Sequence, residues 1–195
     1  MTSTLLDPQT QILRATLADA HELSVLSAAV FPLGCPANTP PDDLADYIAR
    51  EHTPDRYRAM LQDDHLVILI AKVGENLAGL ALLVQAPAPP EMRSAAMLEL
   101  RRFYIDPAYH GRGVANVLMQ AVLAVAAQRG EPSLWLSAFS GNGRAIAFYK
   151  RWGFYIAGEH DFIVGTDRQR DYLMLYEAPL PSGQPGILTN AKEES

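Results

Sequence analysis

The stretch of sequence that decides the fold is residues 103–116, which read FYIDPAYHGRGVAN. Strand-forming residues end at Pro107 and a helical pattern begins at Val114, so strand passes into helix within a few residues. Gly111 and Gly113 lie at this junction, where they let an anion approach the backbone. The first amides of a helix lack intrahelical partners and form the positive end of its dipole. The pattern favours a phosphate-binding loop, although a tight turn without a ligand has the same Gly-x-Gly spacing.

Two familiar phosphate loops do not fit these residues. A Walker A loop needs Lys and then Ser or Thr directly after its second glycine, whereas Val114 and Ala115 follow Gly113. A dinucleotide fingerprint needs a third small residue three positions beyond Gly113, where this sequence has Asn116. A phosphate-binding loop within residues 103–116 would therefore be neither a Walker A loop nor a dinucleotide-binding loop.

The segments on either side of the junction predict one mixed α/β domain. Strands are expected at residues 11–15, 65–71, 77–83, 97–105, 133–139, 154–157 and 171–177. Helices are expected after Thr16 or Asp19 and at residues 40–50, 55–62, 114–129 and 142–152. Because strands and helices mix without strict alternation, the class is α/β (α+β) with one central mixed sheet.

Length and charge narrow the class of protein further. The chain has 195 residues, which fits a single domain at residues 1–178 followed by a turn-rich tail at 179–195. The formal net charge of −6 argues against a nucleic-acid partner. Cys35 is the only cysteine, which excludes an intramolecular disulfide, and no metal site is predicted. With neither a signal peptide nor an apolar stretch of about 20 residues, a cytoplasmic protein without a membrane partner is expected.

A second informative segment covers residues 140–154, SGNGRAIAFYKRWGF. Asn142 is a suitable N-cap for the helix that follows. Four residues share one face of this helix: Ala145, Phe148, Tyr149 and Trp152. Phe148 and Trp152 are interpreted as core residues, whereas the Tyr149 hydroxyl must find a polar environment.

Together the two segments resemble the GCN5-related N-acetyltransferase (GNAT) family over roughly residues 11–177. Residues 110–115, HGRGVA, look like its Gln/Arg-x-x-Gly-x-Gly/Ala loop, with His110 at the position usually held by Gln or Arg. Residues 142–154 look like its second motif. The resemblance implies the GNAT fold, in which helices flank a mixed, mostly antiparallel sheet of six or seven strands. It also implies a V-shaped splay between the two central strands.

The resemblance further implies acetyl-CoA as co-substrate and assigns residues to it. The main chain of Phe103, Tyr104 and Ile105 would pair with the pantetheine arm, and the Phe103 amide would polarise the thioester carbonyl. Asn142 would hydrogen-bond the pantetheine. The pyrophosphate would be held by Gly111, Arg112, Gly113, Val114, Ala115 and Asn116, with Arg112 adding a positive charge.

For catalysis, the resemblance implies that Tyr149 donates a proton to the departing thiolate. A phenol of pKa ~10 and a thiol of pKa ~8.5 make full transfer uphill by roughly 2 kcal/mol. Unless its pKa is perturbed, Tyr149 is therefore expected to stabilise the thiolate by a hydrogen bond and to leave its protonation to solvent. Glu99 lies where the histone-acetylating branch places its base, but it is equally interpreted as the partner of Arg101 or Arg102. Ser137 lies where another branch has its base, and a serine cannot act as one by itself.

The acceptor is expected to be a primary amine that attacks the thioester directly in a ternary complex. Residues 158–174 resemble the end of a group that includes a bacterial polyamine acetyltransferase, and a polyamine suits an acidic chain. Ordering of the final hairpin is the alternative role for these residues, and His160 is assigned none. Peptide amines, aminoglycosides and a coenzyme A-binding sensor without efficient chemistry remain alternatives. Family members are often homodimers.

Overall fold

The computed structural model describes residues 10–87, 89, 97–130 and 133–178 of the chain, so the predicted tail at 179–195 lies outside it. Seven strands form one sheet in the order β1-β2-β3-β4-β5-β7-β6. The strands are β1 (Thr10–Arg14), β2 (Leu66–Val73), β3 (Asn76–Ala86), β4 (Met97–Ile105), β5 (Ser133–Phe139), β6 (Tyr155–Val164) and β7 (Asp167–Glu177). The α-helices are α1 (Ala20–Val30), α2 (Pro41–Glu51), α3 (Pro54–Leu61), α4 (Val114–Gln128) and α5 (Gly143–Arg151). Short 3-10 turns occupy Leu17–Asp19, Phe31–Gly34 and Pro107–Tyr109.

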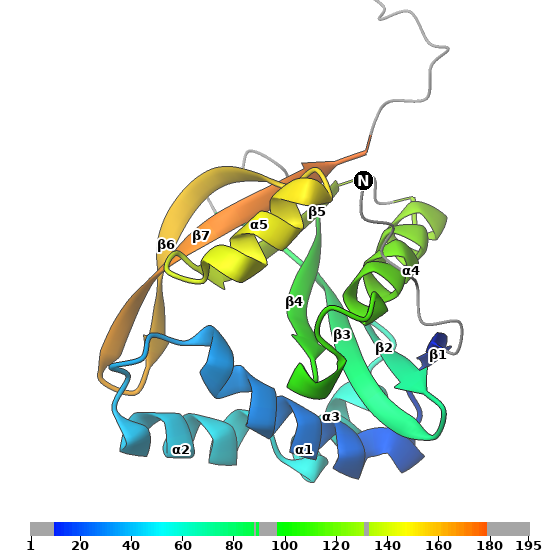
Figure 1. Cartoon of the computed structure of the whole chain (residues 1–195), viewed down its shortest axis with the longest axis horizontal. Coiled ribbons are helices and arrows are strands. Elements are labelled where there is room, and N and C mark those ends of the chain that lie inside the picture. Colours follow the sequence, from blue (N-terminus) through cyan, green and yellow to red (C-terminus); the bar gives the residue numbers. More distant parts are fainter. Residues whose placement is uncertain (1–9, 88, 90–96, 131–132, 179–195) are drawn as a thin grey trace, which may run out of the picture.

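The centre of the sheet opens between β4 and β5, which confirms the predicted splay. These two strands are the one parallel pair among the described strands, and they are in register only at Leu98 with Leu134 and at Glu99 with Trp135. Beyond these pairs the strands diverge (Figure 1). The mixed, mostly antiparallel seven-stranded sheet flanked by helices is therefore the fold that the sequence predicted.

A β-bulge decides which β4 side chains face which layer. The pairing of β3 with β4 skips Arg101, because Leu82 pairs with Arg102 and Leu83 with Leu100. Extra residues of this kind shift the alternation of side chains between the two faces. As a result Leu100 joins the core under α4. Tyr104 packs against the core on the opposite face.

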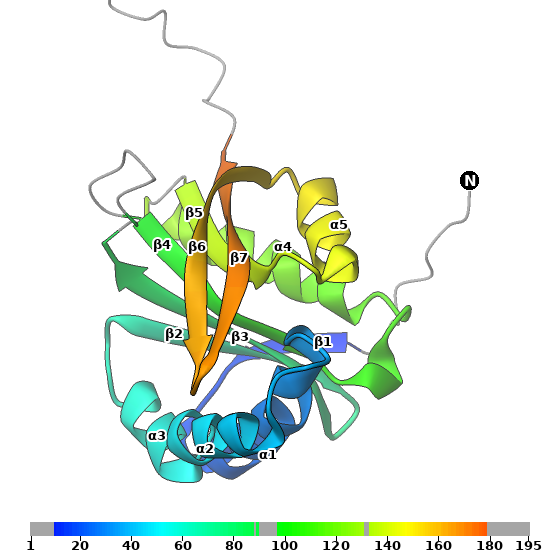
Figure 2. The same ribbon diagram turned by 90° about the vertical axis from the view of Figure 1, so that its left-hand side faces the viewer.

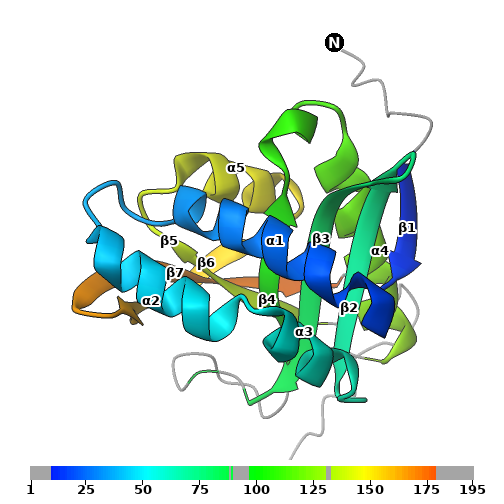
Figure 3. The same cartoon turned by 90° about the horizontal axis from the view of Figure 1, so that it is seen from below.

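Two apolar cores cover the two faces of the sheet. On one face, α4 buries Leu118, Met119 and Val122 against the central strands. On the other face, Leu23 and Leu26 of α1 and Tyr57 of α3 pack against β2 and β3. Viewed from below, α1, α2 and α3 lie together across this second face (Figure 3). The sheet is thus held from both sides except where β4 and β5 separate.

The predicted strand bounds hold at β4 and β5 and fail at the C-terminal hairpin. Strands expected at 154–157 and 171–177 extend to Tyr155–Val164 and Asp167–Glu177. All β6 residues except Val164 are exposed or only partly buried, and this strand lacks the apolar alternation that marks a strand in a sequence. Antiparallel pairing with β7 along its length holds β6 in the sheet instead. This pairing confirms that residues 158–174 form the final hairpin.

A buried histidine joins α2 to α1. His52 is 4% exposed, and its Nδ1 lies 2.8 Å from Ser27 Oγ, which itself donates to the Ser24 carbonyl. Nδ1 of His52 is therefore the donor, and Nε2 has no hydrogen-bond partner among the described residues. Burial, with a smaller contribution from Arg102, lowers the pKa of His52 to about 3. The ring is accordingly neutral in the folded protein.

This neutral histidine should make folding stability depend on pH. The pKa of His52 is about 3 in the folded chain against an ordinary 6.5. Between these values the unfolded chain binds a proton that the folded chain does not, so stability falls as the pH drops below 6.5. At pH 5 the loss from this group is about 2 kcal/mol. We expect His52→Asn, which keeps a donor for Ser27, to flatten the change in unfolding free energy between pH 7 and pH 5.

Denaturant unfolding at the two pH values measures the effect. The exposed His65 provides the matched control, since His65→Asn should leave the wild-type slope unchanged. Equal slopes in His52→Asn and wild type would show that His52 is not the group responsible.

Candidate active site

A large cavity lies where β4 and β5 diverge. Its volume is about 1360 Å³, above the 300–1,000 Å³ common for a single small ligand. The walls come from β4, β5, α5, the loop before α4, the α1–α2 connection and the β6–β7 hairpin. A cavity of this size has room for two substrates.

The register of β4 determines which of its main-chain groups reach the cavity. The Asp106 amide donates to the Ala78 carbonyl of β3 at 3.0 Å. Hydrogen-bonded pairs alternate along an antiparallel ladder, so Tyr104, two residues earlier, also directs its main chain toward β3. Phe103 and Ile105 then direct theirs toward the gap. The predicted main-chain role is thus consistent for Phe103 and Ile105 but not for Tyr104, which lines the cavity with its side chain instead.

The loop before α4 presents backbone amides to the same cavity. Gly111 and Gly113 have φ values of 75° and 86°, in the left-handed region that favours glycine. The first amides to bond into α4 are those of Asn116 and Val117, which donate to the Gly113 carbonyl at 2.9 and 3.2 Å. The amides of Gly111, Gly113 and Ala115 donate to no described residue. This arrangement has the features of an anion site at a helix N-terminus.

Two other residues of the loop contribute differently from the sequence prediction. The Arg112 guanidinium lies over the Tyr109 ring, 5.0 Å from its centroid, and Arg112 does not line the cavity. Its role beside a pyrophosphate stays a prediction. The Val114 side chain is fully buried in the core, so Val114 could serve only through its main chain.

His110 connects the loop to α5. Its Nε2 lies 3.2 Å from the Ile105 carbonyl, and its Nδ1 lies 2.9 Å from an Arg144 nitrogen. Because arginine only donates, Nδ1 is the acceptor and Nε2 carries the proton. At the position where the family usually has Gln or Arg, this chain therefore has a histidine that fixes both informative segments to each other. No pattern in the sequence signals the Arg144 contact.

Tyr149 and Asn142 place α5 at the cavity wall. Tyr149 is 8% exposed and packs edge-on against Phe103, with 6.2 Å between ring centroids. Burial raises the pKa of its phenol. The Asn142 Oδ1 accepts from the Ala145 amide at 3.1 Å, as expected of the N-cap. Both residues line the cavity, together with Phe148.

Glu99 lines the cavity and is paired with an arginine. The Nε and Nη2 atoms of Arg101 donate to its Oε2 at 3.0 and 2.6 Å. Of the two arginines expected as partners, Arg101 is the one that binds. Oε1 has no partner among the described residues, so one carboxylate oxygen remains available toward the cavity.

Three residues from neighbouring strands form a polar cluster that the sequence did not predict. The Ser137 hydroxyl donates to Asp171 Oδ2 at 2.7 Å and lies 2.7 Å from His160 Nε2, which therefore donates to it. Asp171 is 6% exposed, and burial raises the pKa of its carboxyl. His160 was assigned no partner from the sequence. Only the pairing of β5 with β7 and of β7 with β6 brings the three together.

The β6–β7 hairpin reaches across to α2 and completes one wall. Figure 2 shows the hairpin extending toward the helices of the opposite layer. At its tip, the Thr166 amide and hydroxyl donate to Asp43 Oδ2 at 2.8 and 2.7 Å. These bonds lower the pKa of the Asp43 carboxyl. Nearby, Thr39 donates to Asp167 at 2.8 Å.

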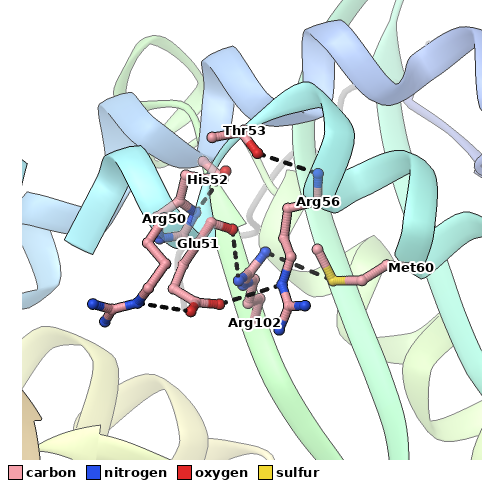
Figure 4. A network of polar contacts seen from close by, with 8 residues as sticks. Arg50, Glu51, His52, Thr53, Arg56, Met60 and Arg102 are labelled. Carbon is pink, nitrogen blue, oxygen red and sulfur yellow. Dashed lines mark hydrogen bonds and ion pairs between the residues drawn. The ribbon is translucent and has the colours of Figure 1, made fainter. Parts of the chain in front are cut away.

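The end of the cavity below α2 and α3 is rich in arginine (Figure 4). Glu51 pairs with Arg50 at 3.2 Å and with Arg56 at 3.5 Å. Arg102 lies beside them and donates to the Glu51 carbonyl at 3.1 Å. Cys35 also lines the cavity, and burial raises the pKa of its thiol to about 11. The thiol is thus protonated at neutral pH, and a protonated thiol is a poor nucleophile.

Two other kinds of site are absent from the described residues. No group of three or more His, Cys, Asp and Glu side chains there is arranged to hold a metal ion. No described helix has the length and apolar character needed to cross a membrane.

Comparison with known proteins gives relatives in one family. Residues 36–154 match the family described as "Acetyltransferase (GNAT) family". An uncharacterized N-acetyltransferase of Mycobacterium tuberculosis is 34% identical over 161 residues, covering 83% of this chain and 99% of the relative. A spermine/spermidine N(1)-acetyltransferase of Bacillus subtilis is 33% identical over 88 residues, which is 45% of this chain and 58% of that protein.

Solved structures share the fold. The PaiA N-acetyltransferase of Thermoplasma acidophilum, in complex with coenzyme A, superposes with a TM-score of 0.69 at 16% identity, covering 86% of this chain and 98% of that one. An N-acetyltransferase from Staphylococcus aureus gives 0.66 at 18% identity, covering 86% and 97%. With the family match over residues 36–154, these findings establish that the chain belongs to the GNAT family of acetyltransferases.

Proposed function

We propose that the protein transfers the acetyl group of acetyl-CoA to a primary amine by direct attack in a ternary complex. The observation that carries this proposal is that one cavity, at the β4–β5 opening, brings the required groups together. It combines the main chain of Phe103 and Ile105, the amides at the start of α4, and the Tyr149 phenol. Coenzyme A bound in a neighbouring structure supports the same use of the fold.

In the proposed complex, the coenzyme is held mainly by backbone. The pyrophosphate lies against the Gly111–Asn116 loop, and the pantetheine extends along the main chain of β4 and contacts the Asn142 amide group. The Phe103 amide polarises the thioester carbonyl, because a donor aimed at developing negative charge lowers the barrier. The amine attacks the carbonyl carbon, the C–S bond breaks, and the thiolate leaves.

Tyr149 then stabilises the thiolate by a hydrogen bond. Full transfer of its proton is already uphill with ordinary pKa values. Burial raises the pKa of the Tyr149 phenol further, so complete transfer becomes less favourable still. The proton that protonates the thiolate comes from solvent in this scheme.

The amine must lose a proton, and Glu99 is the proposed acceptor of it. Its Oε1 is available toward the cavity while Oε2 is held by Arg101. The cluster of Ser137, His160 and Asp171 lies along the same cavity and offers the proton a further route. For an amine of pKa ~10.4, deprotonation at pH 7 costs roughly 4–5 kcal/mol, so such help matters.

The acceptor predicted from the sequence is a polyamine. The Bacillus subtilis relative named as a spermine/spermidine acetyltransferase supports this class. However, the carboxylates of Glu51 and Glu99 already have arginine partners in the cavity. A coenzyme A-binding sensor is the second candidate function, and a homodimer remains a prediction.

Release of free thiol from acetyl-CoA distinguishes enzyme from sensor. We expect release that depends on the added amine, measured across polyamines, lysyl peptides, aminoglycosides and amino acids. If coenzyme A binds and no amine in the panel stimulates release, the protein is a sensor rather than an acetyltransferase.

Tyr149→Phe should separate catalysis from binding. The variant keeps the ring packing but removes the hydroxyl, so kcat should fall by roughly 10- to 100-fold, the effect of one hydrogen bond to a charged group. The Kd for coenzyme A should stay within about threefold. Tyr155→Phe is the matched control, because Tyr155 is exposed, bonds Glu177 and does not line the cavity. Unchanged kcat in Tyr149→Phe would remove the residue from the mechanism.

Gly111→Ala should weaken coenzyme binding beyond its effect on stability. A Cβ at Gly111 meets no atom within 4 Å, and φ is +75°. Gly74 has the same open surroundings at φ +61° but lies in the β2–β3 turn outside the cavity. Both substitutions cost about 1–2 kcal/mol of backbone strain, whereas only Gly111→Ala places a methyl group beside the proposed phosphate. Calorimetry with coenzyme A should show at least a tenfold higher Kd for Gly111→Ala than for Gly74→Ala; equal values would contradict the loop assignment.

A further inference from the structure

Arg102 is a buried cation that has no anionic partner within the described part of the chain. It is 8% exposed and lines the cavity. No carboxylate of a described residue forms an ion pair with it, whereas Glu51 pairs with Arg50 and Arg56, and Glu99 pairs with Arg101. Burying an unpaired charge costs several kcal/mol, so such groups are usually paired. Glu51 and Glu99, the acidic residues near Arg102, are already paired with other arginines.

The contacts of Arg102 within the protein satisfy only part of its guanidinium. One nitrogen donates to the Glu51 carbonyl at 3.1 Å, and another lies 4.0 Å from Met60 Sδ, a weak acceptor. The cation also stands over the Tyr57 ring, 5.3 Å from its centroid. A guanidinium has five N–H donors in a planar fork that matches an oxyanion. Figure 4 shows Arg102 between Glu51 and Met60.

Arg102 lies in the half of the cavity that we assign to the acceptor, and not in the half assigned to the coenzyme. The bulge at Arg101 puts Arg102 and Tyr104 on the α1–α3 side of β4. Phe103, whose ring stacks on Phe148 of α5, lies on the other side. Glu99, the proposed base, is on the same strand three residues before Arg102. A small molecule in this half of the cavity can therefore present an amine near Glu99 and a negative group to Arg102.

We propose that Arg102 binds a carboxylate of the acceptor, so that the substrate is an amine that also carries a carboxylate, such as an amino acid. This inference rests on the proposed acetyl transfer and specifies its acceptor. One unpaired buried charge calls for one negative charge, which a carboxylate supplies and a phosphate dianion exceeds. A polyamine would instead add positive charge beside an arginine whose charge is already uncompensated.

The test compares matched acceptors with and without the negative charge. Amino acids and their carboxamides are assayed by thiol release, with spermidine and the pair phosphoethanolamine and ethanolamine alongside. The wild-type kcat/KM should be roughly 10- to 100-fold higher for each acid than for its amide, the range expected for a hydrogen-bonded ion pair. The amine of the carboxamide is less basic than that of the acid and therefore loses its proton more readily. Basicity alone would favour the amide, so a preference for the acid indicates recognition of the carboxylate.

Arg102→Gln should abolish the preference, lowering kcat/KM for the acid much more than for the amide. Arg56→Gln is the matched control: Arg56 lines the same end of the cavity but is paired with Glu51, so the preference for the acid should persist. Equal losses for acid and amide in Arg102→Gln would assign Arg102 a structural role at the end of α2 and overturn the inference. Thermal unfolding checks that Arg102→Gln folds. If it does not fold, the inference is tested by Arg102→Lys and by the preference of the wild type for acids over amides.

The remaining outcomes are also decisive. Preference of the wild type for amides, spermidine or phosphoethanolamine over amino acids would overturn the carboxylate assignment while leaving acetyl transfer intact. Failure of every amine to release thiol would instead refute the proposed function itself. The two failures are therefore distinguishable in one assay.

Discussion

The separation of β4 from β5 is the constraint on which the rest of the site depends. The main chain of a strand in the middle of a sheet normally hydrogen-bonds to both neighbouring strands, since buried backbone polar groups need partners. Here β4 has a complete antiparallel neighbour in β3 but only two parallel pairs with β5. The main chain of Phe103 and the amide of Ile105 are consequently directed into a cavity rather than into a ladder, while the Ile105 carbonyl accepts from His110. A ligand with its own amide groups is the natural partner for such an edge.

The two ends of the cavity are built by different means. The proposed coenzyme end uses strand edge, left-handed glycines and helix amides, features encoded by short contiguous stretches. The acceptor end uses side chains from α2, α3, β4 and the β6–β7 hairpin, which meet only in the folded chain. This division explains why chains of 16–18% identity share the fold with this one. It also explains why a shared fold does not identify the acceptor.

The same division sets how much the sequence could predict. The β4 and β5 bounds, the glycine loop and the Asn142 cap are local patterns, and the structure contains each of them. The cluster of Ser137, His160 and Asp171 depends on pairing across three strands, so no spacing in the sequence signals it.

Arg101 and Arg102 illustrate the limit most clearly. As adjacent arginines on one strand they are indistinguishable in the sequence, and either was an acceptable partner for Glu99. The bulge makes Arg101 the exposed partner of Glu99 and buries Arg102 beneath α2. A single unpaired residue in the β3–β4 ladder thus separates the ion pair at Glu99 from the proposed recognition of substrate.

The most direct test of the central claim is to follow backbone amide resonances while coenzyme A is added to 15N-labelled protein. The account predicts that the largest shift changes fall on Phe103, Ile105, Gly111 and Gly113, the amides that face the opening. If these four signals stay in place while the coenzyme binds and perturbs another part of the chain, the β4–β5 opening is not the coenzyme site.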